Sequence, residues 1–312
     1  MEQVDTESSR TPLFSSQLAA RTRAAAVDVD GARVAYWSYE PVRATPETRT
    51  ILVVHGFRGD HHGLLRVADQ LPEMRLIMPD LPGFGSSPAF GGGERAGEHS
   101  VERYVRFISD LMAALDLGPE TVLLGHSFGS IIASHFVAAN PGAVAELILV
   151  NPIAAPALQG PKGLMTKLAV LYYEAAARLP RRLGQALLRS QLIVRVMSEA
   201  MAKTRDKELR RFVHAQHSAY FSAFADRESL LEAFKASVGS DVSEVARRLT
   251  LPVLLIAGEK DEIAILPDQH KLAALLPDGV LDVIPGVGHL IHYETPEPAA
   301  RFIRRFLKDH AA

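Results

Sequence analysis

Short, mostly apolar runs alternate with segments of helical periodicity along most of this chain. The apolar runs predict buried strands of the parallel type, which need no polar face because helices cover both sides of such a sheet. These runs lie at 51–54, 75–78, 121–126, 145–150, 252–257 and 280–284. Apolar residues at helical spacing predict helices at 64–71, 101–115, 128–139, 268–276 and 296–308. The alternation therefore predicts an α/β fold with a mostly parallel, doubly wound sheet.

The chain before the first apolar run has a different pattern. Residues 1–22 are rich in Ser, Thr and charge, so we expect a flexible N-terminal segment. Two alternating runs within 26–37 flank Asp30-Gly31, a dipeptide typical of hairpin turns. They predict an antiparallel hairpin at the start of the fold.

Residues 153–246 interrupt the alternation with amphipathic helical patterns at 164–178, 183–201 and 207–224. We expect this segment to be a helical cap inserted after a strand, with a core formed by 23–152 and 247–312. A cap placed over the reactive end of the sheet would supply the substrate pocket and exclude water from it.

The segment Gly125-His126-Ser127-Phe128-Gly129 lies between an apolar strand and an apolar helix. This is the G-x-S-x-G pattern of a strained strand-to-helix turn that exposes its serine. Glycine suits both outer positions, because so tight a turn brings backbone against backbone. The N-terminus of the following helix would direct free N–H groups toward an oxyanion formed nearby. The context therefore makes Ser127 a candidate nucleophile.

Other chemically useful residues also follow the ends of predicted strands. Asp261 and His289 each come just past an apolar run, as do His55-Gly56 and Asp80. In open α/β sheets the reactive groups gather at the carboxyl ends of the strands. This shared position predicts that they lie at one site with Ser127.

The composition excludes some kinds of chemistry and gives no support for some kinds of partner. The chain has 312 residues and no cysteine, which excludes disulfides, thiolate nucleophiles and Cys-based metal sites. A net charge of −2 offers no electrostatic case for nucleic acid or anionic membranes. The N-terminus lacks an apolar secretory signal, and no run reaches the length of a membrane span. We expect a cytoplasmic protein that acts on a small-molecule substrate, without nucleic acid or stable membrane insertion, and the oligomeric state stays open.

These residues and their order resemble the α/β-hydrolase fold superfamily, in its cap-bearing esterase, epoxide-hydrolase and dehalogenase-like branch. The motifs that carry the resemblance are His55-Gly56, Pro79-Asp80-x-Pro82-Gly83-x-Gly85-x-Ser87, Gly125-His126-Ser127-Phe128-Gly129, Gly258-x-x-Asp261 and Gly288-His289. The resemblance implies a triad in which Ser127 attacks, His289 acts as the base and Asp261 orients the imidazole. It also implies an oxyanion hole formed by the backbone N–H groups of Phe57 and Phe128.

The acid has local competitors. Glu259, Glu262 and Asp268 lie close to Asp261 in the sequence, and an acidic turn is often no more than a solvated surface. The branch sometimes places its acid after the sixth strand instead, where this chain has Asn151, which cannot carry the charge. His292 is the nearest rival to His289, but it lacks the Gly-His context.

The remaining site residues are assigned to structure or to the pocket. We expect His55 to support the oxyanion loop by hydrogen bonding and Asp80 to shape its own loop. The candidate pocket residues are His55, Gly56, His126, Tyr172, Tyr220 and Phe224. His55, His61 and His62 with Asp60 lack the spacing of a known metal motif, so we expect no metal and no other cofactor.

Serine at the turn selects among the reactions of this superfamily. The resembling epoxide hydrolases and dehalogenases carry aspartate there, whereas serine suits acyl transfer. We therefore expect hydrolysis of a carboxylic ester, thioester or lactone of a small-to-medium apolar substrate through an acyl-enzyme. A C–C bond hydrolase or another pathway enzyme of this fold is the alternative, weakened because Ser130 stands where those enzymes commonly have a second glycine. A non-catalytic binding module is a further alternative, and the presence of all three triad residues argues against it.

Overall fold

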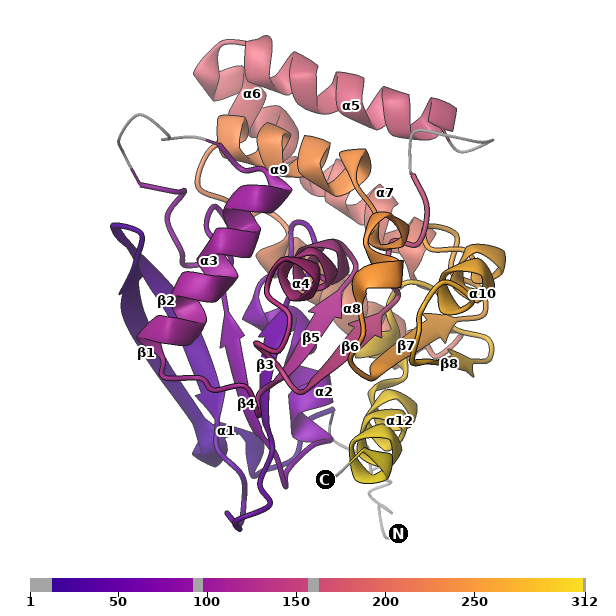
Figure 1. The fold of residues 1–312 in the computed structure, drawn as a ribbon. Helices are drawn as coiled ribbons and strands as arrows, with labels where there is room; N and C mark the ends of the chain where they lie inside the picture. Colours follow the sequence, from indigo (N-terminus) through magenta and orange to yellow (C-terminus); the bar gives the residue numbers. More distant parts are fainter. Residues whose placement is uncertain (1–12, 92–97, 157–162, 311–312) are drawn as a thin grey trace, which may run out of the picture.

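The computed structural model describes residues 13–91, 98–156 and 163–310, which form one twisted sheet with helices on both faces (Figure 1). The sheet has eight strands in the order β1-β2-β4-β3-β5-β6-β7-β8. The strands are β1 (Thr22–Val29), β2 (Ala32–Tyr39), β3 (Thr50–Val54), β4 (Arg75–Pro79), β5 (Val122–His126), β6 (Glu146–Val150), β7 (Val253–Gly258) and β8 (Gly279–Ile284). β1 and β2 form the hairpin, β2 pairs antiparallel with β4, and the remaining pairs are parallel. The predicted fold class is confirmed.

The helices divide between the two faces of the sheet. α3 (Val101–Ala114) and α4 (Phe128–Ala139) cover one face, and α2 (Leu65–Asp69) and α12 (Pro296–Asp309) cover the other (Figure 1). Side chains alternate along each strand, so Leu52 and Val54 join the α3–α4 layer while Ile51 and Val53 join the α2–α12 layer. Because both faces are covered, the central parallel strands are almost wholly apolar, and this is why their sequences show no alternation. Three shorter helices, α1 (Leu18–Arg21), α10 (Leu266–Ala273) and α11 (Ile291–Glu294), complete this part of the chain.

The N-terminal segment contacts the rest of the protein where the structure describes it, and its expected flexibility stays a prediction. Residues 1–12 of the expected flexible segment lie outside the described residues. Ser15 is exposed, and its N–H and hydroxyl donate to the Asp69 carboxylate, at 2.7 and 2.5 Å. The buried Arg21 guanidinium donates to the carbonyl oxygens of Glu40, Ala68 and Leu71. Arg21 therefore supplies hydrogen-bond donors to buried carbonyl groups. The polar composition of the segment does not indicate this role.

The segment 153–246 is helical in the structure. It contains α5 (Gly163–Arg178), α6 (Arg181–Leu188), α7 (Gln191–Met201), α8 (Lys207–Tyr220) and α9 (Arg227–Gly239). The helix predicted over 183–201 is interrupted at Arg189-Ser190, and α9 was not predicted. Asp226 caps α9 by accepting the Ser229 N–H at 2.7 Å, a capping signal that the apolar pattern alone does not contain.

Of these five helices, α5, α6 and α9 lie above the edge of the sheet at which β5 and β6 end (Figure 1). Backbone bonds join the helical segment to the loop after β4: Gly85 N–H donates to Ala223 O at 2.9 Å, and Ala225 N–H donates to Gly83 O at 3.0 Å. Buried residues of α5, α6 and α9, including Tyr173, Leu188 and Leu230, share one apolar cluster with α3 and α4. The division into a core and a cap stays a prediction. Among the described residues no helix has the length and apolar character needed to cross a bilayer.

Candidate active site

Ser127 lies at the turn between β5 and α4 with a backbone φ of +53°. Positive φ is strained for a residue with a Cβ and persists only where the surroundings enforce it. The enforcement comes from the two glycines of the motif. A Cβ on Gly125 would lie 2.4 Å from Gly129 O, and one on Gly129 would lie 2.1 Å from Val54 O. The turn therefore requires glycine at both positions and directs the Ser127 hydroxyl away from the sheet.

His289 connects Ser127 to Asp261. Its Nε2 lies 2.8 Å from Ser127 Oγ, and its Nδ1 lies 2.7 Å from Asp261 Oδ2. A carboxylate accepts, so Nδ1–H donates to Asp261 and Nε2 is left to accept the serine proton. This is the geometry required of a nucleophile, a general base and an orienting acid.

The loops that carry Asp261 and His289 are packed against each other. A Cβ on Gly258 would lie 2.4 Å from Gly288 O, so these glycines permit the close approach. Asn151, at the end of β6, binds both loops: its Oδ1 accepts Gly258 N–H at 2.9 Å and its Nδ2 donates to Gly288 O at 3.3 Å. Asn151 is thus a positioning residue that the sequence did not indicate, because its partners lie 107 and 137 residues away.

The competing acids make other contacts. Glu259 is exposed and accepts the Gly286 N–H at 2.7 Å. Glu262 pairs with Lys203 at 3.0 Å, and Asp268 pairs with Lys271 at 2.8 Å. The structure therefore brings Asp261, among these four acids, to His289.

Asp261 is held as a carboxylate although it is buried. Burial by itself raises the pKa of this carboxyl. The adjacent His289, with its hydrogen bond, and the N–H groups of Ala264 and Ile263 outweigh burial, so the Asp261 pKa lies below its ordinary value. A permanent negative charge can therefore stabilise an imidazolium on His289.

The two predicted oxyanion donors flank Ser127. Phe128 is the first residue of α4, where a helix has free N–H groups and partial positive charge. Phe57 belongs to the loop after β3, and a Cβ on the neighbouring Gly56 would lie 3.2 Å from Ser127 Cβ. Within the described ranges, neither the Phe57 nor the Phe128 N–H donates to a protein acceptor. The arrangement can therefore stabilise negative charge that develops beside the serine.

Comparison with known proteins agrees with this geometry. The model of the serine aminopeptidase S33 family, Hydrolase_4, matches residues 45–296. The chain belongs to this family. The resemblance to the α/β-hydrolase superfamily is confirmed, and with it the prediction that the protein is a hydrolase.

Individual relatives match most of the length of this hydrolase. It is 28% identical to a pimeloyl-[acyl-carrier protein] methyl ester esterase of Chromobacterium violaceum over 266 residues, which is 84% of this chain and 95% of that protein. It is 26% identical over 275 residues to a putative 2-succinyl-6-hydroxy-2,4-cyclohexadiene-1-carboxylate synthase of Bacillus subtilis, covering 83% of this chain and 90% of the relative. An esterase structure from Thermogutta terrifontis superimposes with a TM-score of 0.73 at 23% identity, over 93% of this chain and all of the other, and thus supports the fold.

His55 and Asp80 support the loops around the site in this hydrolase. His55 Nε2 accepts the Leu81 N–H at 2.9 Å, so its Nδ1–H donates to Gly56 O at 2.8 Å. Asp80 is fully buried and accepts the N–H groups of His61 at 2.9 Å and Ser86 at 2.8 Å. Both side chains therefore hold the backbone of these loops in place. Among the described residues, neither forms a hydrogen bond to a triad side chain.

Asp60, His61 and His62 form a group that could supply three metal ligands, since their ligand atoms lie within 4.8 Å of one another. His55, considered with them from the sequence, is not part of this group. His61 Nδ1 bonds to Asp80 Oδ1 at 2.9 Å, and His62 Nδ1 lies 3.2 Å from Asp60 Oδ2. Each candidate ligand thus has a protein partner, and the absence of a metal site stays a prediction.

The candidate pocket residues fall into two groups. Gly56 lies next to Ser127, where an added Cβ would come within 3.2 Å of Ser127 Cβ, and His126 Nε2 lies 3.4 Å from His289 O. The three aromatic candidates all belong to the helical segment. Tyr172 donates to Leu187 O, Tyr220 stacks on His62 at 3.7 Å, and the buried Phe224 lies under the Arg58 and Arg189 guanidinium groups. Their role as a pocket stays a prediction.

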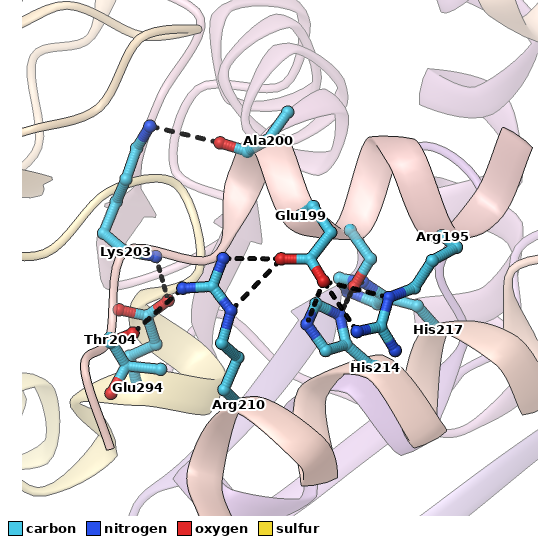
Figure 2. Close-up of polar contacts among 10 residues, drawn as sticks. Arg195, Glu199, Ala200, Lys203, Thr204, Arg210, His214, His217 and Glu294 are labelled. Atoms are coloured by element: carbon cyan, nitrogen blue, oxygen red, sulfur yellow. Dashed lines mark hydrogen bonds and ion pairs between the residues drawn. The ribbon is translucent and has the colours of Figure 1, made fainter. Parts of the chain in front are cut away.

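The chain between α7 and α8 contacts the loop that carries His289. Lys203 N–H donates to Glu294 Oε1 at 2.8 Å, and its aliphatic stem lies over Gly288, where a Cβ would come within 2.8 Å of Lys203 Cγ. Figure 2 shows this segment next to an ion-pair network in which Glu199 binds Arg210 and His214. The contacts of Lys203 with Glu294 and Gly288 join residues distant in sequence and had no signal in the sequence pattern.

Buried histidines make the folded hydrolase sensitive to acid. Burial lowers the pKa of His126 and of His217 to about 3 each, and holds the pKa of His292 well below its ordinary value. The unfolded chain therefore binds more protons than the folded chain between pH 6.5 and the folded pKa values. Each histidine should destabilise the fold by about 1.4 kcal/mol per pH unit as pH falls through this range.

Urea unfolding at pH 7, 6 and 5 measures this loss. The free energy of unfolding should decrease toward pH 5. In His217→Gln the decrease should be smaller by about 1.4 kcal/mol per pH unit, the contribution of one buried histidine. A variant with the same pH dependence as the wild type would contradict the assignment of His217.

Proposed function

We propose that this hydrolase cleaves carboxylic esters, or thioesters and lactones, of small-to-medium apolar substrates through an acyl-enzyme on Ser127. The observation that carries the proposal is the continuous hydrogen-bonded chain Ser127–His289–Asp261 at the N-terminus of α4. Membership of a serine hydrolase family and the esterase relative support it.

The reaction follows from the roles of these groups. Ser127 Oγ attacks the ester carbonyl as His289 Nε2 takes its proton, and Asp261 stabilises the imidazolium that forms. The N–H groups of Phe57 and Phe128 stabilise the negative carbonyl oxygen. Collapse of the intermediate expels the alcohol, which receives the proton from His289. Water, deprotonated by His289, then attacks the acyl-enzyme and releases the acid.

An apolar acyl group suits the surroundings of the oxyanion loop. The Phe57 ring lies 5.8 Å from Phe84, 5.7 Å from Tyr173 and 5.4 Å from Phe234, measured between ring centroids. Pockets that bury an apolar ligand are lined by such aromatic groups. The alternative function is that of a C–C bond hydrolase or another pathway enzyme of this fold, and the similarity to a putative synthase is consistent with it.

Para-nitrophenyl esters of increasing acyl length test the proposal. We expect a burst of nitrophenol that matches the enzyme concentration, followed by steady turnover, because an acyl-enzyme accumulates when deacylation is slower. A fluorophosphonate should label Ser127 and abolish turnover. Labelling of another serine, or hydrolysis of aminoacyl anilides with no ester hydrolysis, would refute the ester assignment.

A further inference from the structure

Arg58 directly follows Phe57 in the loop after β3, and its long side chain is almost fully buried, with 2% exposure. Gly59 N–H donates to Gly56 O at 3.0 Å, so residues 56–59 form a hydrogen-bonded turn with Phe57 and Arg58 at its centre. Arg58 has a φ of +58°. A turn with positive φ at its second central residue normally has glycine there, so arginine needs a reason to occupy the position.

The reason lies in the contacts of the guanidinium. Arg58 Nε donates to Phe221 O at 2.8 Å, and Nη2 donates to Leu188 O at 2.8 Å. Nη1 lies 3.4 Å from the Tyr173 hydroxyl. All three partners belong to the helical segment between β6 and β7, so one side chain of the oxyanion loop ties that loop to three separate helical regions.

The Arg58 guanidinium bonds to two backbone carbonyls and the Tyr173 hydroxyl, and among the described residues no carboxylate forms an ion pair with it. A buried cation without compensation is strongly unfavourable. Leu188 is the last residue of α6 and Phe221 is the C-cap of α8, so both carbonyls lie at helix C-termini, which carry partial negative charge. Two helix ends therefore stabilise the guanidinium, and it is not a free site for an anionic substrate.

We infer that Arg58 is a positioning residue that holds the backbone N–H of Phe57 in place for the oxyanion by locking its turn to α6 and α8. This inference rests on the proposed function. Loss of the side chain removes the contacts that enforce positive φ, and the turn can then relax. A small displacement of an oxyanion donor weakens stabilisation of the transition state more than it weakens substrate binding.

Three substitutions of Arg58 separate this role from simple packing. Arg58→Met keeps the stem without the hydrogen bonds, Arg58→Lys keeps a charge and one donor group, and Arg58→Gly permits positive φ without any tether. Arg189→Met is the matched control, because Arg189 also lies over the Phe224 ring, at 5.1 Å, yet is outside the loop. Active sites are counted by fluorophosphonate titration, so that kcat refers to folded enzyme alone.

We expect Arg58→Met and Arg58→Gly to lower kcat per active site by about 10²-fold, as a misplaced oxyanion donor would, with KM within a few-fold of the wild type. A boronic acid that mimics the tetrahedral intermediate should lose affinity by a similar factor. Arg58→Lys should recover part of both losses, and Arg189→Met should change kcat by no more than a few-fold.

Two results would overturn the inference. One is wild-type kcat and boronate affinity per active site in Arg58→Met and Arg58→Gly, with only thermal stability or active-site number reduced. The other is full activity in Arg58→Gly alone, which would show that the turn requires a residue that tolerates positive φ and does not require the contacts of the Arg58 side chain. Neither result affects the proposed function, whose failure would be seen instead as activity without Ser127.

Discussion

Replacement of Ser127 by alanine should lower ester hydrolysis by about 10⁴-fold or more while leaving the fold intact. The hydroxyl is the acyl acceptor, and its side-chain hydrogen bond in the structure is the one to His289 at 2.8 Å. Alanine keeps the Cβ, so the strain at the positive φ of this turn is the same in both proteins. The rate of para-nitrophenyl ester hydrolysis and the Tm should be measured on the same preparations.

Ser134→Ala is the control for this substitution. Ser134 is a buried serine of the same helix, α4, and its hydroxyl donates to Ile131 O at 3.0 Å, away from the triad. We expect near-normal turnover and a change in Tm no smaller than that of Ser127→Ala. Retention of most activity in Ser127→Ala would show that the nucleophile lies elsewhere.

The second large effect should come from Asp261→Asn, with a fall in kcat of roughly 10²–10⁴-fold and little change in KM. Asparagine keeps the shape, but its amide can donate to His289 Nδ1 and so stabilise the tautomer whose Nε2 carries a proton. That tautomer cannot accept the proton of Ser127. The imidazolium formed during attack also loses the negative charge that lies 2.7 Å away.

Two nearby acids serve as controls for Asp261. Glu259→Gln and Asp268→Asn should each stay within a few-fold of the wild-type kcat, because their carboxylates bind Gly286 N–H and Lys271. Steady-state kinetics on the three variants decides the assignment. A crippled Glu259→Gln with a near-normal Asp261→Asn would mean that the acid was assigned to the wrong carboxylate.

The strands and the elbow could be predicted because their signals are local. Parallel strands covered on both faces must be apolar at every position, so runs such as 51–54 and 252–257 mark them directly. The elbow is recognised from five consecutive residues, 125–129, although the Val54 carbonyl that a Cβ on Gly129 would overlap belongs to β3. The helix boundaries in 153–246 were less certain, because amphipathic periodicity continues across the break at Arg189-Ser190.

The residue pattern alone was enough to predict the fold class and to place Ser127, Asp261 and His289 at one edge of the sheet, because each follows the end of an apolar run. Their roles and order as a triad came from the resemblance to the α/β-hydrolases. How these residues are held in place depends on the packing of the folded chain. Asn151 binds two loops from distant parts of the chain, and Arg58 finds its counter-charge at the ends of α6 and α8. Such partners are brought together by the packing of whole elements, and no local pattern of apolar and polar positions records which carbonyl a given side chain will reach.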